Sequence, residues 1–137
     1  MYRFALPICL ALAATAAHAG ETGLAALKSE AQWQIHEITG APVPEGVAPS
    51  FGMAAAGRLA GTGGCNRFAA PISEEAGRLV IGPVVATRMA CPPPQMAVER
   101  AVFEALERVT AARETPEGIT FYEGATPILR ASRRAPG

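Results

Sequence analysis

Few side chains in this 137-residue chain could carry out catalysis or bind a metal ion. All of the acidic residues are Glu, because the sequence contains no Asp. Of the two histidines, His18 lies in a segment that we expect to be removed, which leaves His36 as the one imidazole. Cys65 and Cys91 remain as thiols once Cys9 is removed with the same segment. Without an Asp to orient the imidazole, no nucleophile–base–orienter set can be assembled, so we expect no enzymatic activity.

Residues 1–19 have the features of a cleaved secretory signal peptide. Arg3 gives a positive start, an apolar stretch follows, and the small residues Ala17 and Ala19 form a cleavage site. The apolar stretch is shorter than the roughly 20 residues that a membrane-spanning helix needs. Lipid attachment at Cys9 is disfavoured, because a large residue precedes it where a small one is required. We therefore expect a periplasmic or secreted protein, cleaved near Ala19, with no stable membrane anchor.

Export bears directly on the two remaining thiols. An even pair of cysteines in an oxidising compartment predicts a disulfide between Cys65 and Cys91. Two alternatives remain open: a free thiol could act as a nucleophile beside His36, or the three residues could bind zinc. The zinc alternative lacks a fourth ligand at a suitable spacing. We expect no metal and no cofactor.

Short apolar segments separated by Gly- and Pro-containing turns predict antiparallel strands. The predicted strands cover residues 33–38, 50–53, 58–60, 68–72, 78–81, 111–115, 119–122 and 126–130. One helix follows the triple proline that ends at Pro94, because Val98, Val102 and Leu106 form a stripe at helical spacing. The expected fold class is mainly β (α+β): a small, curled antiparallel sheet or barrel-like meander, with one α-helix after the second Cys.

Residues 83–89, which precede the helix, are predicted to be extended. We expect Val84 and Val85 to point into the core, and we expect Thr87 and Met89 to share one side of the segment. Met89 is interpreted as a residue that fills the core rather than as a metal ligand.

A glycine run and two polar residues are also informative. Residues 61–64 contain three glycines, which predicts unusual backbone angles or close approach of another segment. A phosphate-binding loop is disfavoured, because no helix follows directly and no Lys is near. Asn66 is expected to satisfy backbone groups of its own turn. Trp33 is expected to anchor the core.

Glu99 is unusual because it lies near the centre of the apolar stripe of the predicted helix. A carboxylate buried there without a partner would cost several kcal/mol. Our hypothesis is that Glu99 accepts hydrogen bonds from backbone N–H groups around Cys65 and Asn66, or that it pairs with Arg67 or Arg88. The alternative, a general acid with a raised pKa, lacks a partner within reach that we can name.

Several of these residues together resemble the META domain family. The resemblance rests on residues 61–68, residues 87–91 and Glu99 with Phe103, and it extends over nearly all of residues 27–131. It implies a small barrel-like sheet carrying a helix, and an HslJ-like, heat-inducible envelope protein linked to stress or antibiotic tolerance. The residues that we assign to its structural motif are Trp33, Gly64, Asn66, Thr87, Met89, Glu99 and Phe103.

The predicted organisation is a signal peptide (1–19), a lead-in (20–26), a META-like domain (27–131) and a flexible basic tail (132–137). With 12 basic and 12 acidic residues, the chain gives no electrostatic case for binding nucleic acid. We expect a monomeric, non-enzymatic binding or structural module, whose partner is an unknown protein or a small apolar ligand. The alternative is an inhibitor of a secreted or envelope hydrolase that acts through an exposed loop, residues 41–49.

Overall fold

The computed structural model describes residues 20–28 and 30–134, so the predicted signal peptide lies outside the described residues. The elements are η1 (Gly23–Leu27), β1 (Gln32–Ile38), β2 (Ala41–Pro42), β3 (Ser50–Ala55), β4 (Arg58–Thr62), β5 (Arg67–Glu75), β6 (Arg78–Ile81), β7 (Val85–Ala86), α1 (Pro93–Arg108), β8 (Ala111–Glu114), β9 (Gly118–Glu123) and β10 (Thr126–Arg133). Within the described residues, no helix is both long and apolar enough to cross a membrane.

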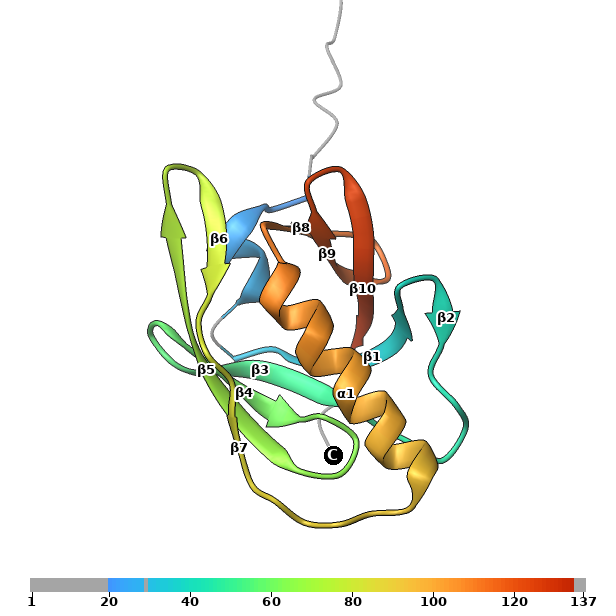
Figure 1. Cartoon of the computed structure of the whole chain (residues 1–137). Coiled ribbons are helices and arrows are strands. Elements are labelled where there is room, and N and C mark those ends of the chain that lie inside the picture. The colour runs from blue at the N-terminus through green and yellow to red at the C-terminus, as the bar shows by residue number, and fades with distance from the viewer. Residues whose placement is uncertain (1–19, 29, 135–137) are drawn as a thin grey trace, which may run out of the picture.

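The strands form one antiparallel sheet with the order β6-β5-β4-β3-β1-β10-β9-β8, and β2 and β7 pair at its side with β1 and β5. Two meanders, β3–β6 and β8–β10, are joined by β1 between them (Figure 1). The sheet curls without closing into a barrel, because the edge strands β6 and β8 do not form a ladder. One backbone hydrogen bond bridges these edges, from Leu79 N–H to the Thr110 carbonyl at 2.9 Å. The predicted fold class, mainly β with one helix, is confirmed.

A bulge in β1 explains why the alternation of this strand is imperfect. Trp33 and Ile35 are buried, and the register against β10 then shifts between Ile35 and Glu37. The extra residue returns Ile38 to the buried side, where strict alternation would have placed Glu37. Trp33 is 1% exposed, and its Nε1–H donates to the Leu27 carbonyl at 3.2 Å. The predicted core anchor is therefore confirmed.

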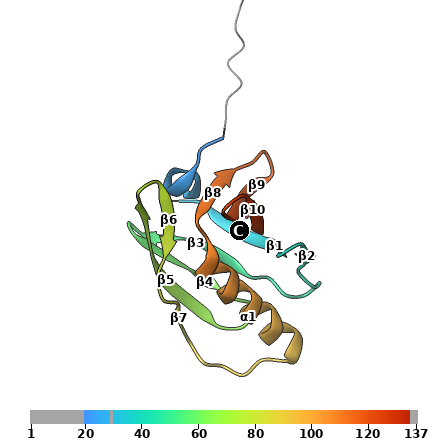
Figure 2. The ribbon, with the colours of Figure 1, turned by 45° about the horizontal axis from the view of Figure 1, so that its top comes forward.

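The helix α1 lies across the concave side of the curled sheet, where it contacts β1, β10 and β6 (Figures 1 and 2). Proline occupies its first turn, where the missing N–H would have had no partner in any case. Val98, Val102 and Leu106 are buried, as the periodicity predicted. Glu99 is buried beside them, so α1 brings one carboxylate into the apolar interior.

The short helix η1 fills the gap between the two sheet edges, where it contacts β8, β5 and β6. On one side, Leu24 N–H donates to the Glu74 carboxylate at 2.8 Å. On the other side, Lys28 Nζ donates to Glu114 Oε1, also at 2.8 Å. Leu27 is fully buried. The predicted lead-in thus packs as part of the domain.

The predicted flexible tail over residues 132–137 is wrong at its start. Strand β10 continues to Arg133, and Ser132 pairs with Gly118 of β9. The Arg133 guanidinium lies 5.4 Å from the centre of the Trp33 ring. Strand pairing and this stacking hold Arg133 in place. Residues 135–137 lie outside the described part of the chain.

Candidate functional site

The two cysteines form a disulfide, as predicted. The bond joins Cys65 in the glycine-rich turn to Cys91 just before α1, with their Cα atoms 6.0 Å apart. No free thiol is therefore left in the described residues, which removes the nucleophile hypothesis for Cys65, Cys91 and His36. Within the same residues, no group of three or more His, Cys or Glu side chains could hold a metal ion. A disulfide is typical of proteins that fold outside the cytoplasm.

Next to the disulfide, Asn66 binds the buried carboxylate of Glu99 through two donors. The Asn66 backbone N–H donates to Glu99 Oε1 at 2.6 Å, and Asn66 Nδ2 donates to Oε2 at 2.9 Å. The two residues are 3% and 6% exposed, respectively. The first form of the Glu99 hypothesis is thus confirmed. The second is wrong, because Glu99 forms no ion pair with Arg67 or Arg88 in the described residues.

The other side of the Asn66 amide holds the segment that leads into α1. Asn66 Oδ1 accepts the Met89 backbone N–H at 2.6 Å and the Thr87 hydroxyl at 3.0 Å. Asn66 Nδ2 also donates to the Met89 carbonyl at 3.2 Å. Since Nδ2 carries two hydrogens, one serves Glu99 and the other serves Met89. Asn66 was predicted to satisfy its own turn, but its side chain instead joins two segments distant in sequence: it binds the Thr87 hydroxyl and the Met89 backbone on one side and the Glu99 carboxylate on the other.

The glycine run is required for this close approach. A Cβ on Gly63 would lie 2.8 Å from Glu99 Cγ and 2.9 Å from Phe103 Cε1. Gly64 has φ +123°, a value that side chains disfavour. Phe103 packs edge-on against Phe68, with ring centres 5.5 Å apart. The glycines therefore let the turn sit directly on the helix, with Glu99 within reach of Asn66.

Two residues that were predicted to fill the core face outward. Val85 is 73% exposed and Met89 is 56% exposed. Val84, by contrast, is half-buried and packs against the core, as expected. The prediction failed because β7 forms only two pairs with β5, and because Asn66 holds the segment by its backbone rather than by its side chains.

A groove of about 610 Å³ lies between this segment and α1. Its apolar walls come from Val84, Val85 and Met89 on the segment and from Met96 and Phe103 on the helix. The buried Asn66–Glu99 pair lies at its base. We call residues 84–90 the presented segment, because their backbone is fixed while several of their side chains are exposed.

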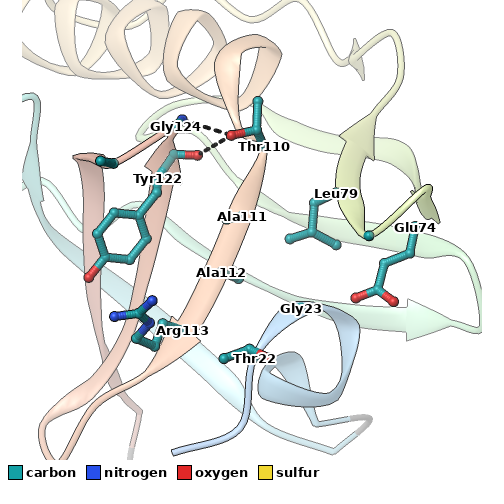
Figure 3. A pocket seen from close by; sticks show the side chains of 12 residues that line it. Thr22, Gly23, Glu74, Leu79, Thr110, Ala111, Ala112, Arg113, Tyr122 and Gly124 are labelled. Carbon is teal, nitrogen blue, oxygen red and sulfur yellow. Dashed lines mark hydrogen bonds between the residues drawn. The ribbon is translucent and has the colours of Figure 1, made fainter.

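A second hollow, of about 620 Å³, lies at the open seam between β6 and β8 (Figure 3). Several of its polar groups have partners inside the domain. The Thr110 hydroxyl bonds to the Gly124 N–H and to the Tyr122 carbonyl, and the Arg113 guanidinium lies 5.6 Å from the Tyr122 ring centre. Glu74 is engaged by η1, as described above. These contacts give the hollow a structural role in holding the seam.

Sequence reasoning found Cys65, Cys91, Asn66 and Glu99 but missed their joint effect on the presented segment. The structure brings Gly64, Asn66, Thr87, Met89, Glu99 and Phe103 into this one site, whereas Trp33 lies apart in β1. The shared side of Thr87 and Met89 was predicted, but it did not indicate which residue would bind this segment. Asn66 contacts the Thr87 hydroxyl and both backbone polar groups of Met89, and no local sequence pattern marks such long-range contacts.

Comparisons with known proteins identify the family and solved structures with a similar fold. The model of the META domain matches residues 25–135. The fold is similar to the NMR structure of a protein from Burkholderia xenovorans, with a TM-score of 0.63 and 21% identity, over 80% of this chain and 85% of that one. It is also similar to the NMR structure of a second protein, with a TM-score of 0.56 and 19% identity, over 76% and 89% of the two chains. No curated protein matches. At these identities the solved structures show a shared fold, and the match over residues 25–135 shows that the chain belongs to the META domain family.

Proposed function

We propose that the chain is an exported, non-enzymatic binding module of the bacterial envelope, which recognises a partner protein with the presented segment. One observation carries this proposal: the exposed apolar side chains of Val85 and Met89 stand on a fixed backbone, which is held at Val85 by pairing with Ala69 and at Met89 by two hydrogen bonds with Asn66. A fixed binding segment loses little conformational entropy when a partner binds, which favours affinity.

The surroundings of these side chains support a binding surface rather than incidental exposure. Single exposed apolar residues are common on proteins. Here, Val85 and Met89 line one side of the groove, and Met96 and Phe103 of α1 line the other side. Binding sites are commonly concave and lined by apolar side chains, as this groove is. Met side chains adapt their shape to a partner, which suits such a surface.

Crosslinking from the presented segment tests this proposal. The same photoreactive amino acid replaces Val85 in one variant and Met89 in another. A third variant carries it in place of Val80, an apolar residue of β6 that is 39% exposed, and serves as the matched control. We expect discrete protein adducts from positions 85 and 89 in intact cells, and none from position 80. The same probe at Glu45 tests the alternative loop, residues 41–49. Adducts from Glu45 alone, or equal adducts from all positions, would contradict the proposal.

Export is part of the same proposal. It is supported by the disulfide and by the signal-like composition of residues 1–19. We expect the mature protein in the periplasmic fraction to begin at Gly20, as N-terminal sequencing would show. Recovery of the full-length chain in the cytoplasm would contradict export.

A role in stress or antibiotic tolerance is supported by the family resemblance. Deletion of the gene should then reduce survival after heat or antibiotic exposure.

A further inference from the structure

One peptide bond in the presented segment is held on both sides. Arg88 is exposed, and within the described residues its guanidinium forms no ion pair. Before it, Thr87 N–H donates to the Arg67 carbonyl at 3.0 Å, and the Thr87 hydroxyl accepts the Arg67 N–H at 3.2 Å. After it, Met89 is bound through both of its backbone polar groups by Asn66. Arg88 is thus a free side chain between two fixed neighbours.

The disulfide adds a covalent restraint to the same segment. Cys91 lies two residues after Met89 and is bonded to Cys65, which directly precedes Asn66. The chains on both sides of the Arg88–Met89 bond are therefore attached to one short stretch of the scaffold, residues 65–67. If that bond were cut, both new ends would remain in place.

The segment is free of the helix and turn conformations that a protease cleft does not accept. Residues 87–92 form neither helix nor turn, and none of them has a positive φ. Peptides that bind in extended form contribute main-chain hydrogen bonds, while separate pockets select individual side chains. An exposed arginine is the side chain that a trypsin-like specificity pocket, with its carboxylate at the base, accepts.

We propose that Arg88–Met89 is the reactive site of a substrate-like inhibitor of trypsin-like serine proteases. This inference rests on the proposed function, because it assigns a chemical class of partner to the presented segment. The partner would insert the Arg88 guanidinium into its specificity pocket and would bind the flanking backbone in extended form.

The chemistry at this bond is reversible because the leaving group cannot depart. The protease serine Oγ attacks the Arg88 carbonyl carbon, the bond to Met89 N breaks, and the serine proton passes through the protease histidine to that nitrogen. Ordinarily the new amine diffuses away and water completes hydrolysis. Here, Asn66 and the disulfide keep the Met89 amine beside the ester. The amine attacks the ester carbonyl carbon, its proton returns through the protease histidine to the serine oxygen, and the serine is expelled as the peptide bond is restored.

Inhibition of trypsin by the disulfide-bonded protein tests this inference. We expect slow, tight inhibition by the wild-type protein, and a loss of at least about 30-fold in affinity for Arg88→Ala, the size expected for an interface hot spot. Arg88→Lys should retain inhibition. Arg88→Phe should lose inhibition of trypsin and gain inhibition of chymotrypsin. Arg100→Ala, an exposed arginine of α1, is the matched control and should inhibit as the wild type does.

A second variant tests whether the Thr87 side of the bond, which carries the ester, must also be held for the two ends to rejoin. Thr87→Val removes one hydroxyl at the surface and leaves the core intact, so it should fold, but trypsin should cut it at Arg88–Met89 faster than the wild type. Rapid hydrolysis of the wild type at this bond, or no inhibition at a large molar excess over trypsin, would overturn the inference. If positions 85 and 89 give crosslinks but the protein does not inhibit trypsin, this inference is overturned and the proposed function stands. Absence of both would overturn the proposed function as well.

Discussion

Asn66 holds Met89 through both backbone polar groups, with Oδ1 2.6 Å from the Met89 nitrogen and Nδ2 3.2 Å from its carbonyl oxygen. The amide of one buried residue thereby fixes an exposed one, whose side chain is 56% exposed. Glu99 in turn fixes Asn66, since its carboxylate accepts two N–H groups of that residue. A buried polar network of this kind stabilises a unique geometry only when every member is satisfied.

Replacement of Glu99 with Gln should destabilise the domain. The Gln amide oxygen can still accept one Asn66 donor, but its NH2 group faces the other donor and leaves it without an acceptor, so we expect a loss of about 1–3 kcal/mol. Thermal or denaturant unfolding would measure it. Glu104→Gln, an exposed residue on the same helix, is the control and should leave the free energy of unfolding nearly unchanged. Equal stability of Glu99→Gln and the wild type would contradict the network.

Removal of the disulfide should cost about 3–4 kcal/mol, estimated from the loop-closure entropy of a bond that spans 26 residues. The double variant Cys65→Ser/Cys91→Ser would show this loss in denaturant unfolding. Thiol counting on the denatured mature protein should find no free thiol in material from an oxidising compartment. Two free thiols there would refute the bond.

Gly63→Ala should destabilise the protein by about 1–3 kcal/mol, the usual cost of an extra methyl group in a packed site. The new Cβ would press on Glu99 Cγ and on the Phe103 ring. Phe103→Leu replaces that ring with a smaller side chain and so relieves part of the clash. The double variant should therefore lose less free energy of unfolding than the sum of the two single changes. Strict additivity in unfolding measurements would show that Gly63 does not approach the helix closely.

The contact between η1 and β8 should depend on pH. The hydrogen bond from the Lys28 ammonium lowers the pKa of the Glu114 carboxyl below its ordinary value. The pKa of Glu114 is therefore lower in the folded state than in the unfolded state. The stabilisation that the Lys28–Glu114 contact provides is present above the unfolded-state pKa of about 4.3, and it is lost as the pH falls through the folded-state pKa. The stability difference between the wild type and Glu114→Gln should therefore be present at neutral pH and shrink below about pH 4.

Glu117→Gln, an exposed change after β8, is the control for this pH series and should give no comparable difference. A wild-type advantage over Glu114→Gln that stays constant from neutral to strongly acidic pH would contradict the ionic contact. Added salt should also reduce the advantage, because the pair lies near the surface.

The sequence predicted eight of the ten strands of the described residues, the helix and the disulfide, because each depends on local pattern or on residue count. It did not predict the β1 bulge, which places Ile38 rather than Glu37 on the buried side. The Glu99 partner was predictable, because a carboxylate in an apolar stripe must find donors. Pairing of β1 between β3 and β10 joins segments far apart in the chain, and local pattern does not specify it.

The outward direction of Val85 and Met89 was not predictable from hydrophobicity. Apolar residues in extended segments usually mark a buried side, but this segment is anchored by its backbone to Asn66. That anchoring depends on a side chain more than 20 residues away in sequence. Hydrophobic pattern records side-chain burial and carries no information on such long-range bonds to the backbone.

Amide hydrogen exchange at Met89 tests most directly whether Asn66 fixes the presented segment. The account predicts strong protection of the Met89 N–H in the wild-type protein, although its side chain is exposed, and rapid exchange at the neighbouring Arg88 N–H. Asn66→Ala, measured under conditions where it remains folded, should remove the protection at Met89. Exchange of the wild-type Met89 N–H at the rate of an unstructured peptide would contradict the account.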